Sequence, residues 1–561
     1  MTATATTSRS VLRQAISGQR RRVTLASVLA AGHQGGEALV PVIIGVVIDQ
    51  AVDGGSAGTL VFWIAVLGVI FAGLSYSYRF AARAAEGASL RAAHDLRIAI
   101  SRRVLHPGGG ADKGKLAGEL VNIGTSDAQR VGVVNAALPF GIAALAGVLV
   151  SAIALLRISL PLGLLVLLGT PPLLYLAHLI GKPLERRSEA EQERSAHASG
   201  VATDLVSGLR VLKGIGAEPA AVARYRETSQ SSLKATLRAA RAKAWHDGAV
   251  LALTGGFIAV VALVGGHLAS SGSISVGDLV AAVGLAQFLL TPFLIFSWVN
   301  GELAQGRASA ARVADLLTTP VAVDSGDGEL PSPATGNVRF TEVTYGCLRG
   351  VDLDIPAGQL IGVVAADPAA ATDLLDCLGR AGDPAEGKVH VDGVNLSTVD
   401  PDRVREVVLV AAHDADLFEG TLAENVHADG HSIDEALAAS AADEVAAALP
   451  DGTATAVTER GRSLSGGQRQ RVALARALAA DAPVLVVHDP TTAVDTVTEA
   501  KIAAGLARLR RGRTTILVTT SPALLAVADR VVVLDGGRIT GEGGHAELAR
   551  DRADYRAAVL S

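Results

Sequence analysis

The chain has 561 residues, which is too long for one compact domain and allows two or three. Hydrophobic residues make up 49% of it and charged residues only 19%, a balance typical of a membrane part joined to a soluble part. The formal net charge of −5 leaves no basic surplus for binding nucleic acid. The two cysteines, Cys347 and Cys377, support neither a disulfide framework nor a metal site.

Six apolar stretches are long enough to cross a bilayer, which takes about 20 residues each. Arginines and lysines gather before the first stretch and after the second and fourth, whereas the connections after the first and fifth have none. The positive-inside rule therefore predicts a multi-pass protein of the cell membrane with both termini in the cytoplasm. The stretches lie at about residues 23–50, 59–82, 131–155, 159–181, 247–270 and 276–299.

Two long polar loops, 83–130 and 182–246, are compatible with helix throughout and predict membrane helices that continue into the cytoplasm. The segment 318–337 is rich in Pro, Gly, Ser and Asp and is typical of a linker. After it, short apolar runs alternate with helical stretches, which predicts an α/β domain. The expected organisation is a membrane domain at 1–317, the linker, and a soluble α/β domain at 338–561.

One octet late in the chain, Leu464–Arg471, reads LSGGQRQR and directly precedes a helical stretch. A serine and two glycines before a helix leave backbone N–H groups available to hold a phosphate at the helix N-terminus. A glycine-rich helix start of no function is the alternative. The strand-like run that follows, and the sequence DPTTAVD after it, make a functional phosphate site the better interpretation. The residues concerned are Ser465, Gly466, Gly467 and Gln468.

These segments, in this order, resemble the signature and Walker B regions of ABC-transporter ATPase domains. The resemblance covers nearly the whole chain, since Gly118–Leu120 and Asp127 are similar to the first cytoplasmic loop of exporter halves and Gly208–Lys213 to the second. It implies a type IV ABC exporter fold, in which six membrane α-helices precede an α/β P-loop-NTPase-like ABC domain. It also implies ATP and Mg²⁺ as cofactors.

The segment at the Walker A position of this family, 365–372, lacks the residues that phosphate binding needs. A P-loop uses glycine to wrap its backbone around phosphate and lysine to neutralise the charge. Ala365 and Ala370 stand at the two glycine positions and Ala371 at the lysine position, so that only Thr372 remains as a possible Mg²⁺ ligand.

The other hydrolytic positions of the family are altered as well. His488 stands where the metal-associated Walker B aspartate belongs, and Asp489 where the catalytic glutamate belongs. His413 occupies the position of the Q-loop glutamine, and Thr520 that of the switch histidine. The chain is therefore predicted to hold no hydrolytic machinery of its own.

In this family two ATPase domains meet head to tail, and each ATP lies between the Walker motifs of one and the signature of the other. This chain keeps the signature and Asp495 at the D-loop position, but not the Walker residues. We therefore expect the non-catalytic subunit of a heterodimeric exporter of a small molecule, peptide or lipid. Its partner in the lipid membrane would carry intact Walker motifs, and ATP and Mg²⁺ would bind mainly at the shared site.

Three other functions stay open at this point: siderophore-type import by the same fold, a regulatory membrane scaffold that does not transport, and a weak homodimeric ATPase that uses Asp489. The retained signature favours a transporter over a scaffold, because a scaffold has no chemical need for a phosphate-binding helix start. The missing lysine argues against the weak ATPase.

Two ionisable residues in the first span, His33 and Glu37, lie four apart on one helix face and are candidates for the substrate pathway. Mutual neutralisation, or a place at a water-filled mouth, is the alternative. The segments at about 108–118 and 208–217 are expected to form short coupling helices against the ATPase domains. Gly108–Gly110 would break a helix in the first of them.

Overall fold

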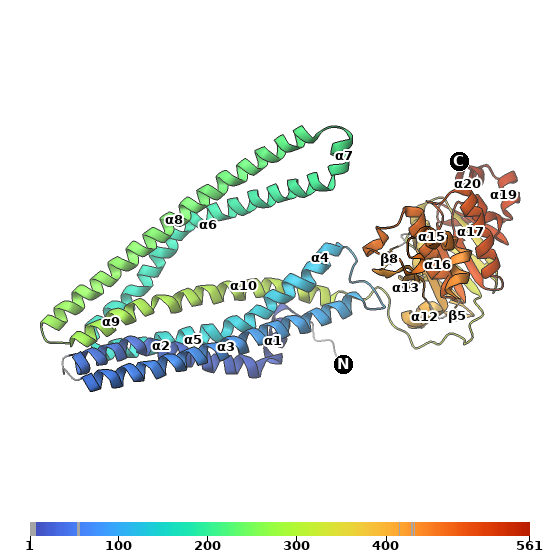
Figure 1. The fold of residues 1–561 in the computed structure, drawn as a ribbon. Coiled ribbons are helices and arrows are strands. Elements are labelled where there is room, and N and C mark those ends of the chain that lie inside the picture. Colours follow the sequence, from blue (N-terminus) through green and yellow to red (C-terminus); the bar gives the residue numbers. More distant parts are fainter. Residues whose placement is uncertain (1–6, 53–56, 414–415, 428–429, 431, 561) are drawn as a thin grey trace. The chain divides into compact units, whose positions relative to one another are not determined.

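The computed structural model describes residues 7–52, 57–413, 416–427, 430 and 432–560 (Figure 1). Two compact units emerge from the contacts within the chain. The first unit, the membrane unit, extends to Ile100 and continues over Gly118–Thr318. The second, the soluble unit, combines Ser101–Ala117 with the chain from Thr319 onward.

Six helices of the membrane unit are long and apolar enough to span a bilayer, which confirms the six predicted spans in the described part of the chain. The helical stretches run from 31 to 53 residues, well beyond the ~20 that a bilayer requires, so the predicted extensions are also present. The helices of this unit are α1 (Ser8–Gly18), α2 (Arg20–Val47), α3 (Ala57–Val104), α4 (Ala117–Asn122), α5 (Ala128–Ile158), α6 (Leu160–Ser207), α7 (Leu209–Gly214), α8 (Glu218–Ser270), α9 (Val276–Phe288) and α10 (Leu290–Thr318), with π-helical turns at Ile48–Val52 and Ile123–Asp127.

Small residues let the membrane helices approach closely. The buried face of α3 consists mainly of alanines, and a Cβ on Gly132 of α5 would lie 2.5 Å from the carbonyl oxygen of Ser89 on α3. Close backbone approach is how helices associate in lipid, where the hydrophobic effect offers no drive between them. The helices α6 and α8 run side by side, joined through α7 (Figure 1).

Two carboxylates tie together helices that are far apart in sequence. Asp49 accepts hydrogen bonds from the hydroxyl of Ser275, at 2.5 Å, and from the N–H of Gly277, at 2.8 Å, which joins the end of the first span to the start of the sixth. Asp127, which is buried, accepts a 2.8 Å hydrogen bond from the guanidinium of Arg312 on α10. These hydrogen bonds fix how the helices align along one another, which the sequence does not indicate because the bonded residues are far apart in the chain.

The soluble unit has a six-stranded, mostly parallel sheet of order β12-β11-β3-β10-β9-β6, a four-stranded antiparallel sheet of order β2-β1-β4-β5, and the pair β7-β8. Aliphatic residues on both faces of the large sheet form two core clusters, as expected for buried parallel strands. The strands are β1 (Val338–Tyr345), β2 (Leu348–Ile355), β3 (Leu360–Ala365), β4 (Glu386–Val391), β5 (Val394–Asn395), β6 (Val408–Ala411), β7 (Gly420–Thr421), β8 (Ala456–Val457), β9 (Val484–His488), β10 (Thr514–Val518), β11 (Arg530–Asp535) and β12 (Arg538–Gly543). The helices are α11 (Pro368–Leu378), α12 (Pro401–Val407), α13 (Leu422–Val426), α14 (Ile433–Ala439), α15 (Ala442–Ala448), α16 (Gly466–Ala479), α17 (Thr496–Leu509), α18 (Pro522–Ala526), α19 (His545–Asp551) and α20 (Ala553–Val559).

The short helix expected near 108–118 is absent, so that prediction was wrong. The chain leaves α3 at Val104 and turns until α4 begins at Ala117, with positive φ at Gly109 and Gly110. A Cβ on Gly110 would lie 2.6 Å from the carbonyl oxygen of Pro320, so this turn packs against the start of the linker. Glycine is needed there for close approach and for the left-handed backbone. The second expected helix exists as α7.

Candidate functional site

Four adjacent strands of the large sheet bring the altered family positions to one edge. His413 follows β6, His488 ends β9, Thr520 follows β10 and Ala365 ends β3, and these strands are neighbours and parallel. Ligands of open α/β sheets bind at the carboxyl ends of such strands. The structure therefore gathers the residues that sequence comparison singled out, at the place where a nucleotide would be expected.

The Walker A segment is not shaped as a phosphate loop. Only Ala366 and Asp367 separate β3 from α11, because Pro368 already begins the helix. Proline suits the first helical position, where its missing N–H costs nothing, and Asp367 is a favourable N-cap. The local sequence thus starts the helix two residues before Ala370, at the second glycine position.

Four backbone donors of this segment, on Ala366, Ala369, Ala370 and Ala371, already bind acceptors within the chain. The N–H of Ala366 binds the carbonyl oxygen of Leu534, at 3.1 Å, and the N–H groups of Ala370 and Ala371 bind that of Asp367, at 3.1 and 3.2 Å. The N–H of Ala369 donates to the Asp367 carboxylate at 2.9 Å. A carboxylate of the chain itself therefore satisfies the helix N-terminus that a phosphate would otherwise occupy.

The side chains at the lysine and Mg²⁺ positions make contacts within the domain and are not available to a nucleotide. Ala371 is 4% exposed and belongs to the core of the domain. The hydroxyl of Thr372 donates to the carbonyl oxygen of Pro368 at 3.1 Å, one turn back in the helix. Asp373, the next residue, accepts a 2.5 Å hydrogen bond from the N–H of Cys347. Nothing in this segment supplies a cation to phosphate.

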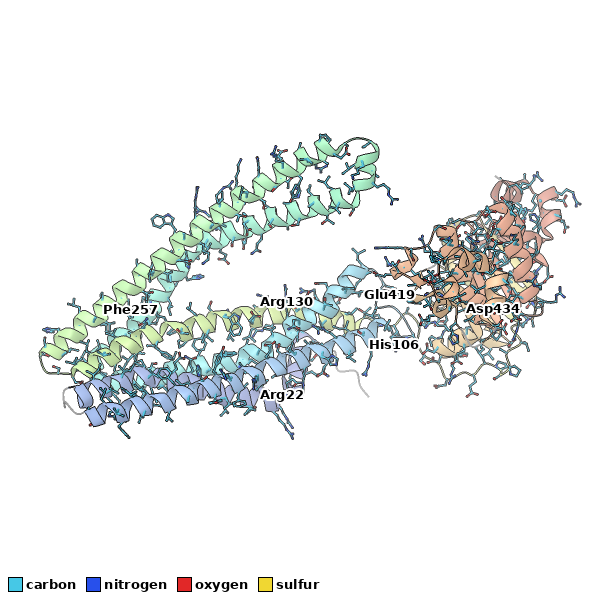
Figure 2. All side chains as sticks on the ribbon, in the orientation of Figure 1. Arg22, His106, Arg130, Phe257, Glu419 and Asp434 are labelled. Carbon is cyan, nitrogen blue, oxygen red and sulfur yellow. The ribbon has the colours of Figure 1, made fainter. Side chains whose placement is uncertain are left out.

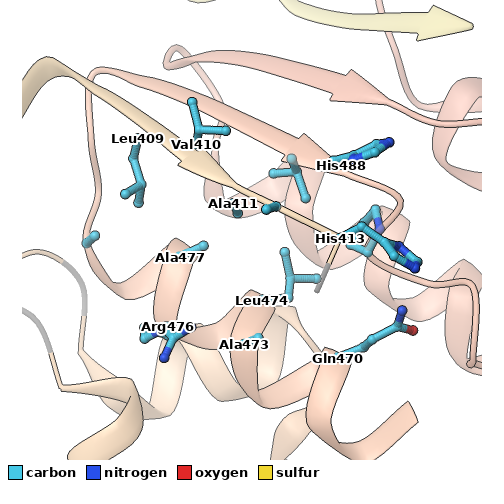
Figure 3. Close-up of a pocket in the computed structure, with 14 residues that line it drawn as sticks. Leu409, Val410, Ala411, His413, Gln470, Ala473, Leu474, Arg476, Ala477 and His488 are labelled. Atoms are coloured by element: carbon cyan, nitrogen blue, oxygen red, sulfur yellow. The ribbon is translucent and has the colours of Figure 1, made fainter. Parts of the chain in front are cut away.

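Two imidazoles and a carboxylate lie at the ends of β6 and β9. The rings of His413 and His488, both labelled in Figure 3, are 5.9 Å apart between centroids. Nε2 of His488 lies 3.7 Å from Oδ2 of Asp489. Burial lowers the pKa of His488, and the neighbouring His413 lowers it further, against the opposing effect of Asp489. Neutral imidazole is therefore favoured at the position where the family places a carboxylate for Mg²⁺.

A pocket of about 420 Å³ lies beside these rings, between the sheet and α16. His413, His488 and Gln470 line its rim, and aliphatic residues such as Leu409 and Leu474 line its wall (Figure 3). Within the described residues, no group of three or more His, Cys, Asp or Glu side chains is arranged to hold a metal ion.

The signature segment presents the opposite arrangement. Ser465 is the N-cap of α16: its hydroxyl accepts the N–H of Gln468 at 3.3 Å, and the Gln468 side chain accepts the N–H of Ser465 at 2.8 Å. Among the described residues, no acceptor is recorded for the N–H groups of Gly466 and Gly467. Ser465 is exposed, so the start of α16 offers two free donors to an external phosphate.

The signature helix is held against the loop that follows β9. Gln470 donates to the Thr492 hydroxyl at 2.7 Å and accepts the N–H of Ala493 at 2.9 Å. A Cβ on Gly467 would overlap the carbonyl oxygen of Ala493, so glycine is required for this approach. Asp495 caps α17 by accepting from Val497 and Thr498, and these hydrogen bonds keep its pKa low. The bridging role of Gln470 was not predicted, because it depends on a loop 22 residues away.

The fit to ATP and Mg²⁺ therefore differs between the two halves of the site. The Walker side does not fit, since four of its backbone donors bind acceptors within the chain and the lysine and Walker B aspartate positions hold Ala371 and His488. The signature side fits a phosphate, with free N–H groups at a capped helix start.

Two segments of the chain match models of known protein families. Residues 23–293 match the ABC transporter transmembrane region, and residues 348–492 match the ABC transporter family. An ATP-dependent lipid A-core flippase of Chromohalobacter salexigens is 31% identical over 406 residues, which cover 70% of this chain and 70% of that protein. The chain belongs to the ABC transporter family. The predicted fold and a multi-pass membrane location with a cytoplasmic ATPase domain are thereby confirmed.

Two further proteins are similar to this ABC transporter over most of its length. A multidrug efflux ATP-binding/permease protein of Mycobacterium tuberculosis is 32% identical over 532 residues, which cover 92% of this chain and 44% of that protein. The chain thus spans less than half the length of this mycobacterial relative. A solved bacterial Atm1-family ABC exporter with ATP bound has the same fold, with a TM-score of 0.73, 24% identity, and coverage of 96% of this chain and 97% of that one.

The membrane candidates lie between the first two spans. Nδ1 of His33 is 3.0 Å from the carbonyl oxygen of Leu74 on α3, and its Nε2 is 3.8 Å from Glu37. Glu37 also accepts a 3.1 Å hydrogen bond from Gln34. The carboxylate is 47% exposed, whereas His33 is half-buried. His33 therefore joins two helices, and Glu37 is the more accessible of the pair.

Proposed function

We propose that this ABC transporter chain is the non-catalytic subunit of an ATP-driven exporter, and that its signature helix completes the ATP site of a partner subunit. The observation that carries the proposal is the contrast between two helix starts. That of α11 is satisfied by Asp367, whereas that of α16 has free N–H groups on Gly466 and Gly467.

The same contrast favours a heterodimer. Two copies of this chain would pair each intact signature with a Walker segment that has no lysine and a helix N-terminus capped by Asp367. A second half-transporter with intact Walker motifs would bring ATP and Mg²⁺ to the signature of this chain. Ser465, Gly466, Gly467 and Gln468 would then contact the terminal phosphate, and Asp495 would lie near the shared boundary.

The substrate is proposed to be amphipathic. Relatives of this chain are named for multidrug efflux and for lipid A-core flipping, and both names fit export of membrane-soluble molecules. His33 and Glu37 are proposed as polar contacts on the pathway, since an accessible carboxylate in a membrane span is costly without a function. No observation favours import or a scaffold role.

The test is ATPase activity of this chain co-purified with a co-expressed half-transporter that has intact Walker motifs. Ser465→Arg fills the start of α16 with a bulky side chain and should abolish hydrolysis by the pair. Ser432→Arg is the matched control, because Ser432 is also an exposed N-cap serine of the soluble unit, at the start of α14. Asp489→Ala should leave hydrolysis nearly unchanged.

Two results would contradict the proposal. One is loss of turnover in Asp489→Ala with the pair still assembled. The other is ATP hydrolysis by this chain alone, at a rate that Ala371→Lys does not raise. Photolabelling of the purified chain with 8-azido-ATP is an independent test, because the chain alone should incorporate no more label without competing ATP than with excess ATP.

A further inference from the structure

A polar pocket of about 550 Å³ lies in the membrane unit where α1 meets α2, beside α3. Arg20, Arg21 and Arg22 line it from the start of α2, and Arg91 and His94 line it from α3. The nucleotide site does not include it. The lining carries an excess of positive charge, since it has four arginines and one carboxylate, that of Asp95.

The four guanidinium groups form no recorded ion pair among the described residues, and Asp95 forms none with them. The nearby Arg97 is engaged elsewhere, by a 3.1 Å hydrogen bond to Gln129. Like charges gathered in one pocket repel unless an anion lies between them. An anion is therefore the ligand that this lining favours.

Close packing brings one of these arginines onto the neighbouring helix. Arg22, labelled at the start of α2 in Figure 2, is half-buried, and its Nη1 would lie 3.1 Å from a Cβ on Gly87 of α3. The absence of a side chain at Gly87 gives this guanidinium its space.

The position of the pocket relative to the membrane identifies the anion. The apolar part of the first span begins at Val23, so the arginines lie at its cytoplasmic end. Leu25 and Val28 follow Arg21 at helical spacings of four and seven and are 54% and 65% exposed. An apolar surface thus continues directly from the charged pocket into the bilayer. A ligand that covers both has an anionic head and an acyl chain.

We propose that this pocket binds the phosphate headgroup of an anionic membrane phospholipid, with an acyl chain along Leu25 and Val28. Basic pockets at the cytoplasmic ends of membrane helices suit such headgroups, because each arginine near the surface adds electrostatic attraction. This proposal does not depend on whether the signature of the chain completes the ATP site of a partner.

Native mass spectrometry of the full chain in detergent tests the proposal, with phosphatidylglycerol and phosphatidylcholine of identical acyl chains as probes. The wild type should retain phosphatidylglycerol preferentially. Combined Arg20→Gln, Arg21→Gln and Arg91→Gln should weaken that binding by about a hundredfold, since each arginine contributes roughly fivefold. The matched control removes three exposed arginines of α6 and α8 by Arg186→Gln, Arg187→Gln and Arg224→Gln, and should keep the preference.

Replacement of the three pocket arginines by lysine retains the charge and should retain binding, which separates lost charge from misfolding. Equal loss in the pocket and control variants would overturn the proposal, as would equal retention of the two lipids by the wild type. Displacement of phosphatidylglycerol by inorganic phosphate alone would also overturn it, because the pocket would then read a free anion rather than a lipid.

Discussion

The Asp367 carboxylate accepts a 2.9 Å hydrogen bond from the N–H of Ala369, and so caps α11 where a P-loop would bind phosphate. This contact satisfies a backbone donor at the helix N-terminus that a P-loop offers to phosphate. Lost capping residues typically cost about 1 kcal/mol of stability.

Asp367→Ala should therefore lower the free energy of unfolding of the full chain by about 1 kcal/mol without creating an ATP site, since no lysine is present. Chemical denaturation followed by circular dichroism measures the first effect, and 8-azido-ATP labelling the second. Asp400→Ala, which removes the equivalent cap of α12, should give a similar loss of stability. New labelling in Asp367→Ala would show that this carboxylate alone keeps nucleotide out.

Removal of one partner from a buried ion pair should destabilise the soluble unit more than removal of one partner from an exposed ion pair. The Arg510 side chain is 0% exposed and pairs with Asp481 at 3.2 Å, and burial lowers the pKa of the guanidinium to about 10. Asp481→Ala leaves that charge without its partner and should cost about 3–5 kcal/mol. The exposed pair of Arg403 and Glu406 is the control, because Glu406→Ala should cost less than ~1 kcal/mol. Equal losses in denaturant unfolding would contradict this ranking.

The two thiols should resist alkylation. Burial raises the pKa of Cys377 to about 12, and burial followed by the charge of Asp373 raises the pKa of Cys347. Asp373→Asn removes a negative charge that disfavours the thiolate, so the pKa of Cys347 should fall. The midpoint of its iodoacetamide rate against pH, read by peptide mass spectrometry, should shift to lower pH. Asp354→Asn, at an exposed ion pair on β2, should leave the midpoint in place.

Stability of the soluble unit should fall in mild acid through His488. Because burial lowers its pKa in the folded state, the unfolded chain binds more protons just below the ordinary value of 6.5. Stability is therefore lost as pH falls from about 6.5, and the loss is complete below the lowered pKa. His488→Gln should flatten unfolding free energy between about pH 7 and pH 5. His427→Gln, at an exposed histidine, should retain the wild-type slope.

The sequence alone determined the features of this protein that depend on the local chemistry of neighbouring residues. Bilayer desolvation needs about 20 apolar residues per span, so the six membrane helices could be read from composition. The loss of lysine at Ala371 and the retention of Ser465 to Gln468 are equally visible, because each residue type carries its own chemistry. The predicted capacity of the α16 start to hold phosphate rests on such local signals.

Tertiary structure decided the rest, because those contacts join residues distant in sequence or depend on where a helix begins. The hydroxyl of Ser275 reaches Asp49 across 226 residues, and no local pattern indicates that bond. The glycines at 108–110 already indicated a break in the helix expected there, but the packing of this turn against the linker is seen only in the tertiary structure. The sequence shows that the Walker segment lacks its glycines and lysine. Only the structure shows that its helix start is also occupied, because α11 begins at Pro368 and Asp367 accepts a hydrogen bond from a backbone donor that phosphate would need.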